Sequence, residues 1–498
     1  MGAGGRMSDS PDQAKDGILK RVPIDPPFSL SDLKKAIPAH CFERSVIRSS
    51  YYVVHDLIVT YVFYFLANTY IPLLPTPLAY LVWPVYWFCQ ASILTGLWVI
   101  GHECGHHAFS EYQLVDDIVG FVLHSALFTP YFSWKYSHRN HHANTNSLDN
   151  DEVYIPKRKS KVMIYSKVLN NPPGRVFTLV FRLTLGFPLY LLTNVSGKKY
   201  GRFANHFDPL SPIFTERERI QVMLSDLGII AVVYALKLLV AAKGFTWVMC
   251  MYGIPVIGVH AFFVLITYLH HTHLSLPHYD STEWKWIKGA LSTIDRDFGF
   301  LNRVFHDVTH THVLHHLISY IPHYHAKEAR DAIKPVLGDY YKIDRTPIFK
   351  AMWREAKECM YIEPDQDSEQ KGLPAYLTCR CVIPIVDKNI AAQVSVIVKV
   401  EEREGHNKVS PLPYGHLFKG CLALAAATVS ERKVGSWRNA VMNAENTKDM
   451  SYEKSQKAKE VGKYEMKWHP VSLINHVMSP PRNLWLTKRN RWTIIHSS

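Results

Sequence analysis

The sequence predicts an all-α integral membrane protein with four transmembrane helices that are joined by interfacial helices. Three observations support this prediction: long apolar windows, histidines gathered in short clusters, and basic loops on one side of the membrane. The chain has 498 residues, of which 47% are hydrophobic. About 20 consecutive apolar residues cross the hydrocarbon core of a bilayer. Four windows approach that length, at residues 52–70, 78–100, 222–242 and 245–269.

The basic loops predict the orientation. Residues 133–221 contain fourteen Lys or Arg against six Asp or Glu. If the four windows cross, this loop and both termini share one face, which the positive-inside rule makes cytosolic. Two shorter apolar stretches, 118–132 and 176–193, are each interrupted by a proline and by a histidine or an arginine. They must therefore lie in the interface or cross as a pair.

Composition divides the chain into three parts. Residues 1–50 are a polar arm, expected on the cytosolic side, and they lack the apolar core of a signal peptide. Residues 51–372 contain the spans and most of the histidines. Residues 373–498 are an atypical extension without a strong span. We expect it to be poorly ordered and assign it no role, since a misjoined reading frame would explain it equally well.

Charge and cysteine content exclude several classes. Basic loops beside a membrane explain the net charge of +13, so we expect no nucleic-acid partner. The eight cysteines form no C-x-x-C pair, which argues against a disulfide framework and against a zinc ribbon.

Histidine is the informative residue. Of 27 histidines, seven fall within 102–142 and twelve within 260–325. Three clusters stand out, H-E-C-G-H-H at 102–107, H-R-N-H-H at 138–142 and H-V-L-H-H at 312–316. Residues three or four apart share a helix face, so each cluster points several imidazoles the same way. Eight or nine imidazoles exceed the needs of one tetrahedral ion and suit two ions. Isolated histidines such as His124 and His260 are expected to be hydrogen-bonded core residues.

Three chemistries compete for these clusters. The first cluster matches H-E-x-x-H, in which Glu103 would be the general base of an intramembrane zinc metalloprotease. That interpretation leaves the second and third clusters unused. A proton-relaying transporter would place its ionisable groups inside the spans, whereas these follow the spans. Two iron ions explain the clusters better, because such a pair activates dioxygen and removes hydrogen from an unactivated C–H bond.

With these separations, the three boxes resemble those of plant membrane-bound fatty-acyl desaturases. More narrowly, they resemble the oleate delta-12 desaturase group of the endoplasmic reticulum. The likeness continues through 270–279 and 322–326 and covers roughly residues 1–370. It makes 51–372 a membrane desaturase domain, with four spans and a cytosolic helical cap that holds a histidine-ligated di-iron site. It also implies an endoplasmic reticulum location and a cytosolic active site.

The resemblance further implies partners and ligands. The substrate would be an acyl-phospholipid, and the electrons would come from cytochrome b5 and its reductase, since no H-P-G-G haem segment is present. Homo- or hetero-oligomers with related desaturases are also conceivable. A tenth ligand, His271 or alternatively His273, is expected between the last span and the third box. The box ligands carried over are His102, His106, His107, His138, His141, His142, His312, His315 and His316.

Departures from the ordinary delta-12 pattern point to a modified reaction. Ordinary members have Ala where this chain has Gly101, and we expect the missing methyl beside a ligand to leave room for the acyl chain or an iron to shift. The departures resemble daisy-family enzymes with acetylenic or conjugated products, above all the crepenynate-forming delta-12 acetylenase. The predicted reaction is dehydrogenation of linoleoyl, and to some extent oleoyl, chains at the 12,13 position. An ordinary oleate desaturase and a conjugase are the alternatives. The other departures are Asn140, His270, His310 and Leu314.

Overall fold

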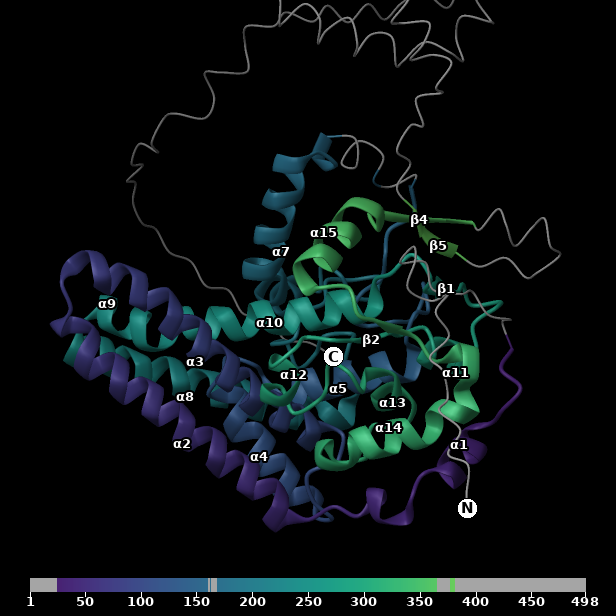
Figure 1. Cartoon of the computed structure of the whole chain (residues 1–498), viewed down its shortest axis with the longest axis horizontal. Coiled ribbons are helices and arrows are strands. Elements are labelled where there is room, and N and C mark those ends of the chain that lie inside the picture. Colours follow the sequence, from purple (N-terminus) through teal and green to yellow (C-terminus); the bar gives the residue numbers. More distant parts are fainter. Residues whose placement is uncertain (1–24, 160–161, 163–167, 365–376, 381–498) are drawn as a thin grey trace, which may run out of the picture. The chain divides into compact units, whose positions relative to one another are not determined.

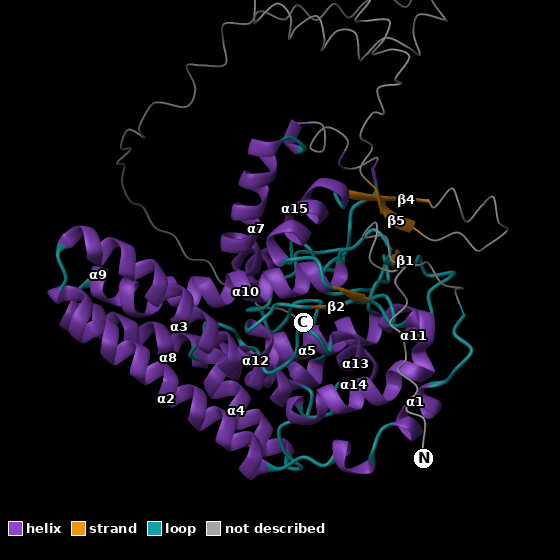
Figure 2. Ribbon diagram, in the orientation of Figure 1, coloured by secondary structure: helices purple, strands orange, loops and turns teal. Residues whose placement is uncertain are grey.

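The computed structural model describes residues 25–159, 162, 168–364 and 377–380. Helices dominate these residues (Figure 2). Five helices are long and apolar enough to cross a membrane, by length and composition. The first three are α2 (Val46–Tyr70) with the 3-10 turn η3 (Ile71–Leu73), α3 (Thr76–Gly105) and α7 (Pro172–Thr193). The fourth is α8 (Arg219–Lys243), preceded by the 3-10 turn η4 (Glu216–Glu218). The fifth begins with α9 (Phe245–Val248) and continues through a π-turn, η5 (Met249–Gly253), into α10 (Ile254–His271).

Four of these helices correspond to the predicted windows, and the fifth, α7, is the apolar stretch 176–193. Its companion 118–132 cannot cross, because it is divided between α4 (Gln113–Ser125) and α5 (Tyr131–Asn144). The thirteen residues of α4 reach about 20 Å, against about 30 Å of hydrocarbon. Of the two alternatives predicted for these stretches, crossing as a pair is therefore excluded. In Figure 1, α7 points in a different direction from α10, which favours four crossings.

Helices α3 and α10 pack against each other at the centre of the bundle, while α2 and α8 lie further out. The outer helices expose large apolar side chains, such as Ile58 on α2 and Ile230 on α8. This is the pattern of helix faces that meet lipid. Helix α3 starts after Pro75 with a proline in its first turn. Its first half is largely exposed, and its second half, from Gln90 onward, is buried almost without interruption. The first histidine cluster lies at that buried end.

A second layer of short helices covers the ends of α3, α5 and α10. Its apolar core joins the N-terminal arm to α11, α13 and α14. Buried Arg296 fastens this layer to the bundle, since it donates to the Leu269 carbonyl at 2.6 Å and to Glu355 at 3.0 Å. The elements are α1 (Leu30–Ala36), η2 (Ala39–Phe42), α11 (Trp286–Ala290), α12 (Leu301–Val304), α13 (His312–Leu317), α14 (His323–Leu337), η6 (Gly338–Tyr340) and α15 (Ile348–Glu358).

Five short strands among the described residues make the all-α prediction wrong in detail. Strands β1 (Pro277–His278), β5 (Leu377–Arg380) and β4 (Tyr361–Pro364) form an antiparallel sheet in that order, and β2 (Asp295–Arg296) pairs in parallel with β3 (Ile343–Asp344). The boundary predicted at 372/373 thus falls between two paired strands. The rest of the predicted extension lies outside the described residues.

Topology can be tested by inserting a short glycosylation acceptor at single sites. Four crossings with α7 at the interface predict that acceptors at 73 and 244 become glycosylated, whereas acceptors at 149 and 331 do not. Microsomal gel shifts with and without a glycosidase provide the measurement. Glycosylation at 149 or at 331, but not at both, would contradict the shared face on which the histidine site depends.

Candidate metal centre

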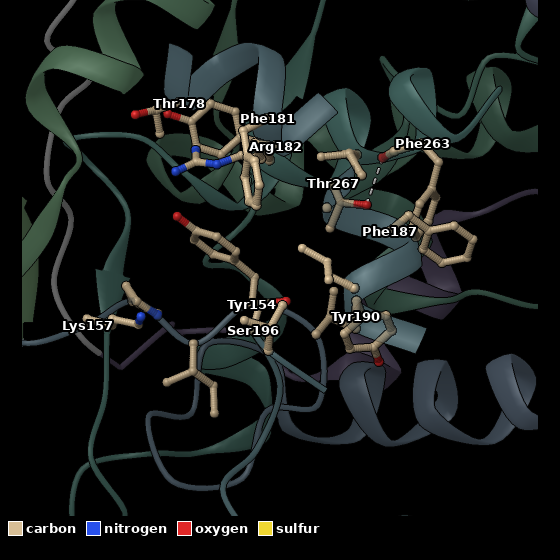
Figure 3. A pocket seen from close by; sticks show the side chains of 18 of the residues that line it. Tyr154, Lys157, Thr178, Phe181, Arg182, Phe187, Tyr190, Ser196, Phe263 and Thr267 are labelled. Carbon is tan, nitrogen blue, oxygen red and sulfur yellow. Dashed lines mark hydrogen bonds between the residues drawn. The ribbon is translucent and has the colours of Figure 1, made fainter. Parts of the chain in front are cut away.

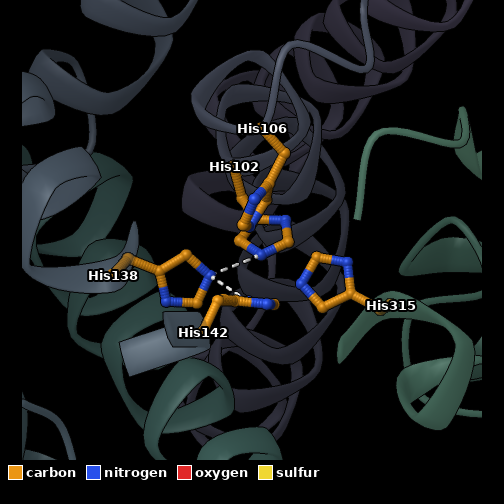
Figure 4. Close-up of side chains that lie close together, drawn as sticks. All are labelled: His102, His106, His138, His142 and His315. Atoms are coloured by element: carbon orange, nitrogen blue, oxygen red, sulfur yellow. Dashed lines mark hydrogen bonds between the residues drawn. The ribbon is translucent and has the colours of Figure 1, made fainter. Parts of the chain in front are cut away.

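One group of five histidines comes from three helices. His102 lies in the last turn of α3 and His106 caps the end of that helix, His138 and His142 stand one turn apart on α5, and His315 is on α13. Each offers a ring nitrogen, and these five atoms lie within 4.8 Å of one another. Figure 4 shows the rings approaching a common centre from different sides. The four-residue spacing within the first and second clusters therefore brings two histidines of each cluster into this group.

A second group forms beside the first. His141 on α5, His271 on α10 and His316 on α13 bring ring nitrogens within 4.8 Å of one another. His312 joins them, because its Nε2 lies 3.2 Å from Nε2 of both His271 and His316. All four side chains are buried.

The two groups share helices and are in contact. Helix α5 gives His141 to one group and its neighbour His142 to the other, and α13 divides His315 and His316 in the same way. Consecutive residues on a helix point about 100° apart, so one helix serves two adjacent sites. The rings of His142 and His316 stack with centroids 4.2 Å apart. The arrangement provides two adjacent groups of five and four nitrogen donors, each of which could hold a metal ion.

The donor set fits metal cations. Nε2 of His138 lies 3.0 Å from Nε2 of His102 and 3.2 Å from Nε2 of His142. Two nitrogens bound to one ion at about 2.1 Å and roughly a right angle are about 3.0 Å apart. Nε2 of His106 and of His315 are buried, and neither has a hydrogen-bond partner among the described residues. A cation would satisfy these nitrogens.

Burial also keeps the donors unprotonated. It lowers the pKa of His106 to about 3, with His141 and Lys135 adding to the effect. The pKa values of His142 and His316 are held well below the ordinary range, first by burial and then by neighbouring imidazoles. Neutral imidazole is the form that binds metal, so these rings are ready to bind at neutral pH.

Partners that the sequence did not reveal orient several rings. Nδ1 of His141 contacts a carboxylate oxygen of Asp151 at 2.7 Å, and Nδ1 of His316 lies 3.1 Å from the Thr145 hydroxyl. Such contacts fix which nitrogen faces the metal. No motif spacing marks Asp151, which reaches the site because the chain turns back after α5.

Three predicted site residues are placed elsewhere. His107 follows the end of α3 with a φ of 57°, and its Nδ1 faces Asp116 at 2.6 Å, so it joins neither group. Glu103 accepts a hydrogen bond from the His323 amide at 2.9 Å and belongs to neither group. His273 accepts from the Ser275 amide, which leaves His271 as the additional histidine. The set of ten possible ligands thus becomes nine.

Gly101 contacts a core histidine rather than a ligand. A Cβ added there would lie 2.4 Å from Cδ2 of His124. His124 is hydrogen-bonded to the Trp98 carbonyl at 2.9 Å, and His260 to the Leu127 carbonyl at 2.9 Å. The prediction that His124 and His260 are hydrogen-bonded core residues is confirmed.

An apolar pocket adjoins the histidines. Its volume is about 430 Å³, and it lies between α7, α10 and the segment 153–157. Figure 3 shows Lys157 and Arg182 on one side and Phe187 and Phe263 on the other. Val153, Phe263 and Thr267 also line the small cavity among the histidines, so the pocket and this cavity are adjacent.

Comparison with known proteins identifies the family. A family model described as fatty acid desaturase matches residues 78–347, and a model of a domain of unknown function matches residues 20–66. The chain belongs to the fatty acid desaturase family. It is 88% identical to a delta-12 fatty acid desaturase of Calendula officinalis over 373 residues, which are 75% of this chain and 98% of that protein.

Two further relatives show how the similarity is distributed. The chain is 74% identical to a delta-12 fatty acid dehydrogenase of Crepis alpina, over 76% of this chain and 99% of that protein. It is 60% identical to another delta-12 fatty acid desaturase of Calendula officinalis, over 74% of this chain and 97% of that protein. The desaturase family, with its oxidoreductase chemistry, replaces the protease and transporter interpretations.

The two-group arrangement predicts different effects for neighbouring histidines. We expect the wild-type desaturase to bind two iron ions per chain. His106→Ala should lose at least one ion and all turnover, because it removes one of the five donors that surround that ion. His107→Ala should keep both ions, because His107 faces Asp116. Iron analysis of purified, iron-loaded protein tests this expectation. Equal iron loss in the two variants, with intact folding, would contradict the nine-donor set.

Proposed function

We propose that this desaturase is a delta-12 acetylenase that acts on linoleoyl chains of membrane phospholipid and retains some oleate desaturation. The observation that carries the proposal is that the apolar pocket shares Val153, Phe263 and Thr267 with a small cavity that six of the nine histidines line. Such a pocket would hold a long acyl chain with one of its carbons beside the metal centre. This is what dehydrogenation of an unactivated chain requires.

The proposed cofactor is a pair of iron ions held by the five-donor and four-donor groups. When bound, iron supplies dioxygen activation and hydrogen removal from C–H bonds, which no side chain can perform. The protein orients the donors through Asp151 and Thr145. The buried surroundings keep water away from the reacting carbons.

The reaction balances with one external electron pair. A –CH=CH– unit, O2, two electrons and two protons give a –C≡C– unit and two molecules of water. We propose cytochrome b5, with its reductase, as the electron donor, since the chain has no haem-binding segment of its own. We further propose a location in the endoplasmic reticulum membrane with a cytosolic active site, where oligomers with related desaturases could form.

The charges around the pocket support a phospholipid carrier. Arg182 and Lys157 line the same side of the pocket, and Phe187 and Phe263 line the other (Figure 3). Two basic groups suit a phosphate headgroup, and the aromatic side chains suit the acyl tail. The hydroxyl of Thr267 donates to the Phe263 carbonyl at 3.0 Å, so its hydrogen is used internally. The junction with the metal cavity therefore presents mainly apolar surface to the chain.

Product choice is proposed to depend on the space beside Gly101. His124 packs against Gly101 and against Trp134, whose ring lies 5.0 Å from that of His124. Trp134 in turn stacks on the donor His138 with centroids 4.4 Å apart. The volume at position 101 is thus coupled to the metal centre through two aromatic contacts.

Feeding tests the proposed reaction. Yeast that expresses the protein should convert added linoleate into a 12-yne acid and added oleate partly into linoleate, as measured by gas chromatography with mass spectrometry. A His106→Ala variant provides the inactive control. A parent that makes only linoleate would be an ordinary desaturase, and one that makes only conjugated trienes would be a conjugase. Either result would overturn the acetylenase proposal.

Gly101→Ala should shift products from the triple bond toward the cis double bond. The added methyl cannot fit until His124 moves, and overpacking of this kind costs about 1–3 kcal/mol of folding stability. Product ratios per amount of protein provide the measurement. Gly201→Ala is the matched control, because a Cβ there would meet no atom within 4 Å. An unchanged ratio in a well-folded Gly101→Ala protein would contradict the coupling.

A further inference from the structure

A second cluster of metal-binding side chains lies outside the nine-histidine centre. His40 and Cys41 come from η2, just before α2, and His325 and Glu328 come from α14. One potential ligand atom from each lies within 4.8 Å of the others. We propose that these four residues form a structural zinc site that joins the N-terminal arm to α14.

The distances are close to those of a tetrahedral zinc site. Nε2 of His40 lies 3.7 Å from Sγ of Cys41 and 3.0 Å from Oε1 of Glu328. Zinc bonds of about 2.0–2.3 Å to nitrogen, oxygen and sulfur place neighbouring ligand atoms about 3.3–3.6 Å apart in a tetrahedron. The distance from His40 to Cys41 is close to this range, and the distance from His40 to Glu328 has to increase by a few tenths of an ångström. His40 and Glu328 are about half exposed, so their side chains can make this adjustment.

The elements present the ligands in a suitable way. His325 and Glu328 are three residues apart on α14 and therefore share a helix face. His40 and Cys41 are adjacent on a single 3-10 turn. Zinc sites commonly combine ligands from a tight turn with a pair from one helix face. A cysteine, two histidines and a carboxylate also form the nitrogen, sulfur and oxygen donor set that zinc accepts.

An ion pair alone does not explain the cluster. An exposed His40–Glu328 pair contributes little to stability, and it needs neither the thiol nor the second histidine. Cys41 is fully buried and belongs to the apolar core that the arm shares with α13 and α14. Burial and then the Glu328 carboxylate raise the pKa of its thiol to about 11, so zinc would displace a proton on binding.

The surrounding charges balance the ion. A thiolate and the Glu328 carboxylate together neutralise Zn²⁺. Arg48 approaches Nε2 of His325 at 3.4 Å and opposes a cation there, but its guanidinium also stacks on Tyr324 at 4.2 Å. Glu43 also acts on His325 and offsets Arg48. Arg48 therefore weakens the site without preventing it.

Such a site would brace the metal centre from outside. The arm packs through Leu33 and Ile37 against the core that contains Val313 and Leu314 of α13, the helix that carries donors of both groups. Zinc would attach the arm to α14 at Cys41, four residues after Ile37. The site does not depend on the proposed substrate, because none of its four residues belongs to the nine-histidine centre.

Zinc content of iron-loaded protein in lipid nanodiscs tests the proposal. Wild type should hold one zinc ion in addition to iron. Glu328→Gln should bind zinc at least about tenfold more weakly, since even outer partners of metal ligands contribute about 10–100-fold. Asp331→Asn, one turn along the same helix and paired with Arg330, is the matched control and should keep the zinc. Added zinc should raise the unfolding temperature of wild type and of the control but not that of Glu328→Gln.

Cobalt provides a direct view of the thiolate. Protein loaded with Co²⁺ after iron should show a sulfur-to-cobalt charge-transfer band that Cys41→Ser abolishes and Cys89→Ser preserves. Equal zinc content in Glu328→Gln and Asp331→Asn would overturn the proposal and leave a surface ion pair. A cobalt spectrum that does not change in Cys41→Ser would also overturn it.

Discussion

The structure depends on one constraint: nine imidazoles, six of them buried and three partly buried, must face one another at one place. Desolvation lowers the pKa of His106 and of His142, and several nitrogens of the two groups have no hydrogen-bond partner in the described part of the chain. Cations are the natural counterpart of such a set, because each neutral imidazole offers a lone pair. Four helices from distant parts of the sequence have to end at the same place for this to occur. The bundle and its covering layer can be understood as the scaffold that brings them there.

Lipid access and metal binding use the same helices. Helix α10 lines the apolar pocket with Phe263 and Thr267 and, one turn further on, brings His271 to the second group. Helix α3 is largely exposed in its first half and carries His102 and His106 at its buried end. Between them, the same two helices thus line the apolar pocket and the membrane-facing surface and also carry metal donors.

Residues outside the two donor groups position the helices and the side chains of the centre. Arg296 links the end of α10 to Glu355 on α15, and Asp151 holds His141. His124 lies against Gly101 and packs on Trp134, which stacks on the donor His138. The chain is more similar to the Crepis alpina dehydrogenase, at 74%, than to the second Calendula officinalis desaturase, at 60%. We propose that related desaturases differ in their products through small changes in this packing.

The apolar helices and the histidine clusters could be predicted from the sequence alone, because they depend on local patterns of length, composition and helical spacing, and the desaturase family followed from the resemblance of the three boxes. The sequence could not divide the boxes between two ions. It placed His107 with the donors, whereas the backbone turns it toward Asp116 after α3 ends. It left His271 and His273 as alternatives, and only the direction in which α10 ends separated them. Asp151, the pocket, the short strands and the contact between Gly101 and His124 all join residues that are distant in sequence. Tertiary packing decided these features, because periodicity records which face of an element is buried but not which neighbour it meets.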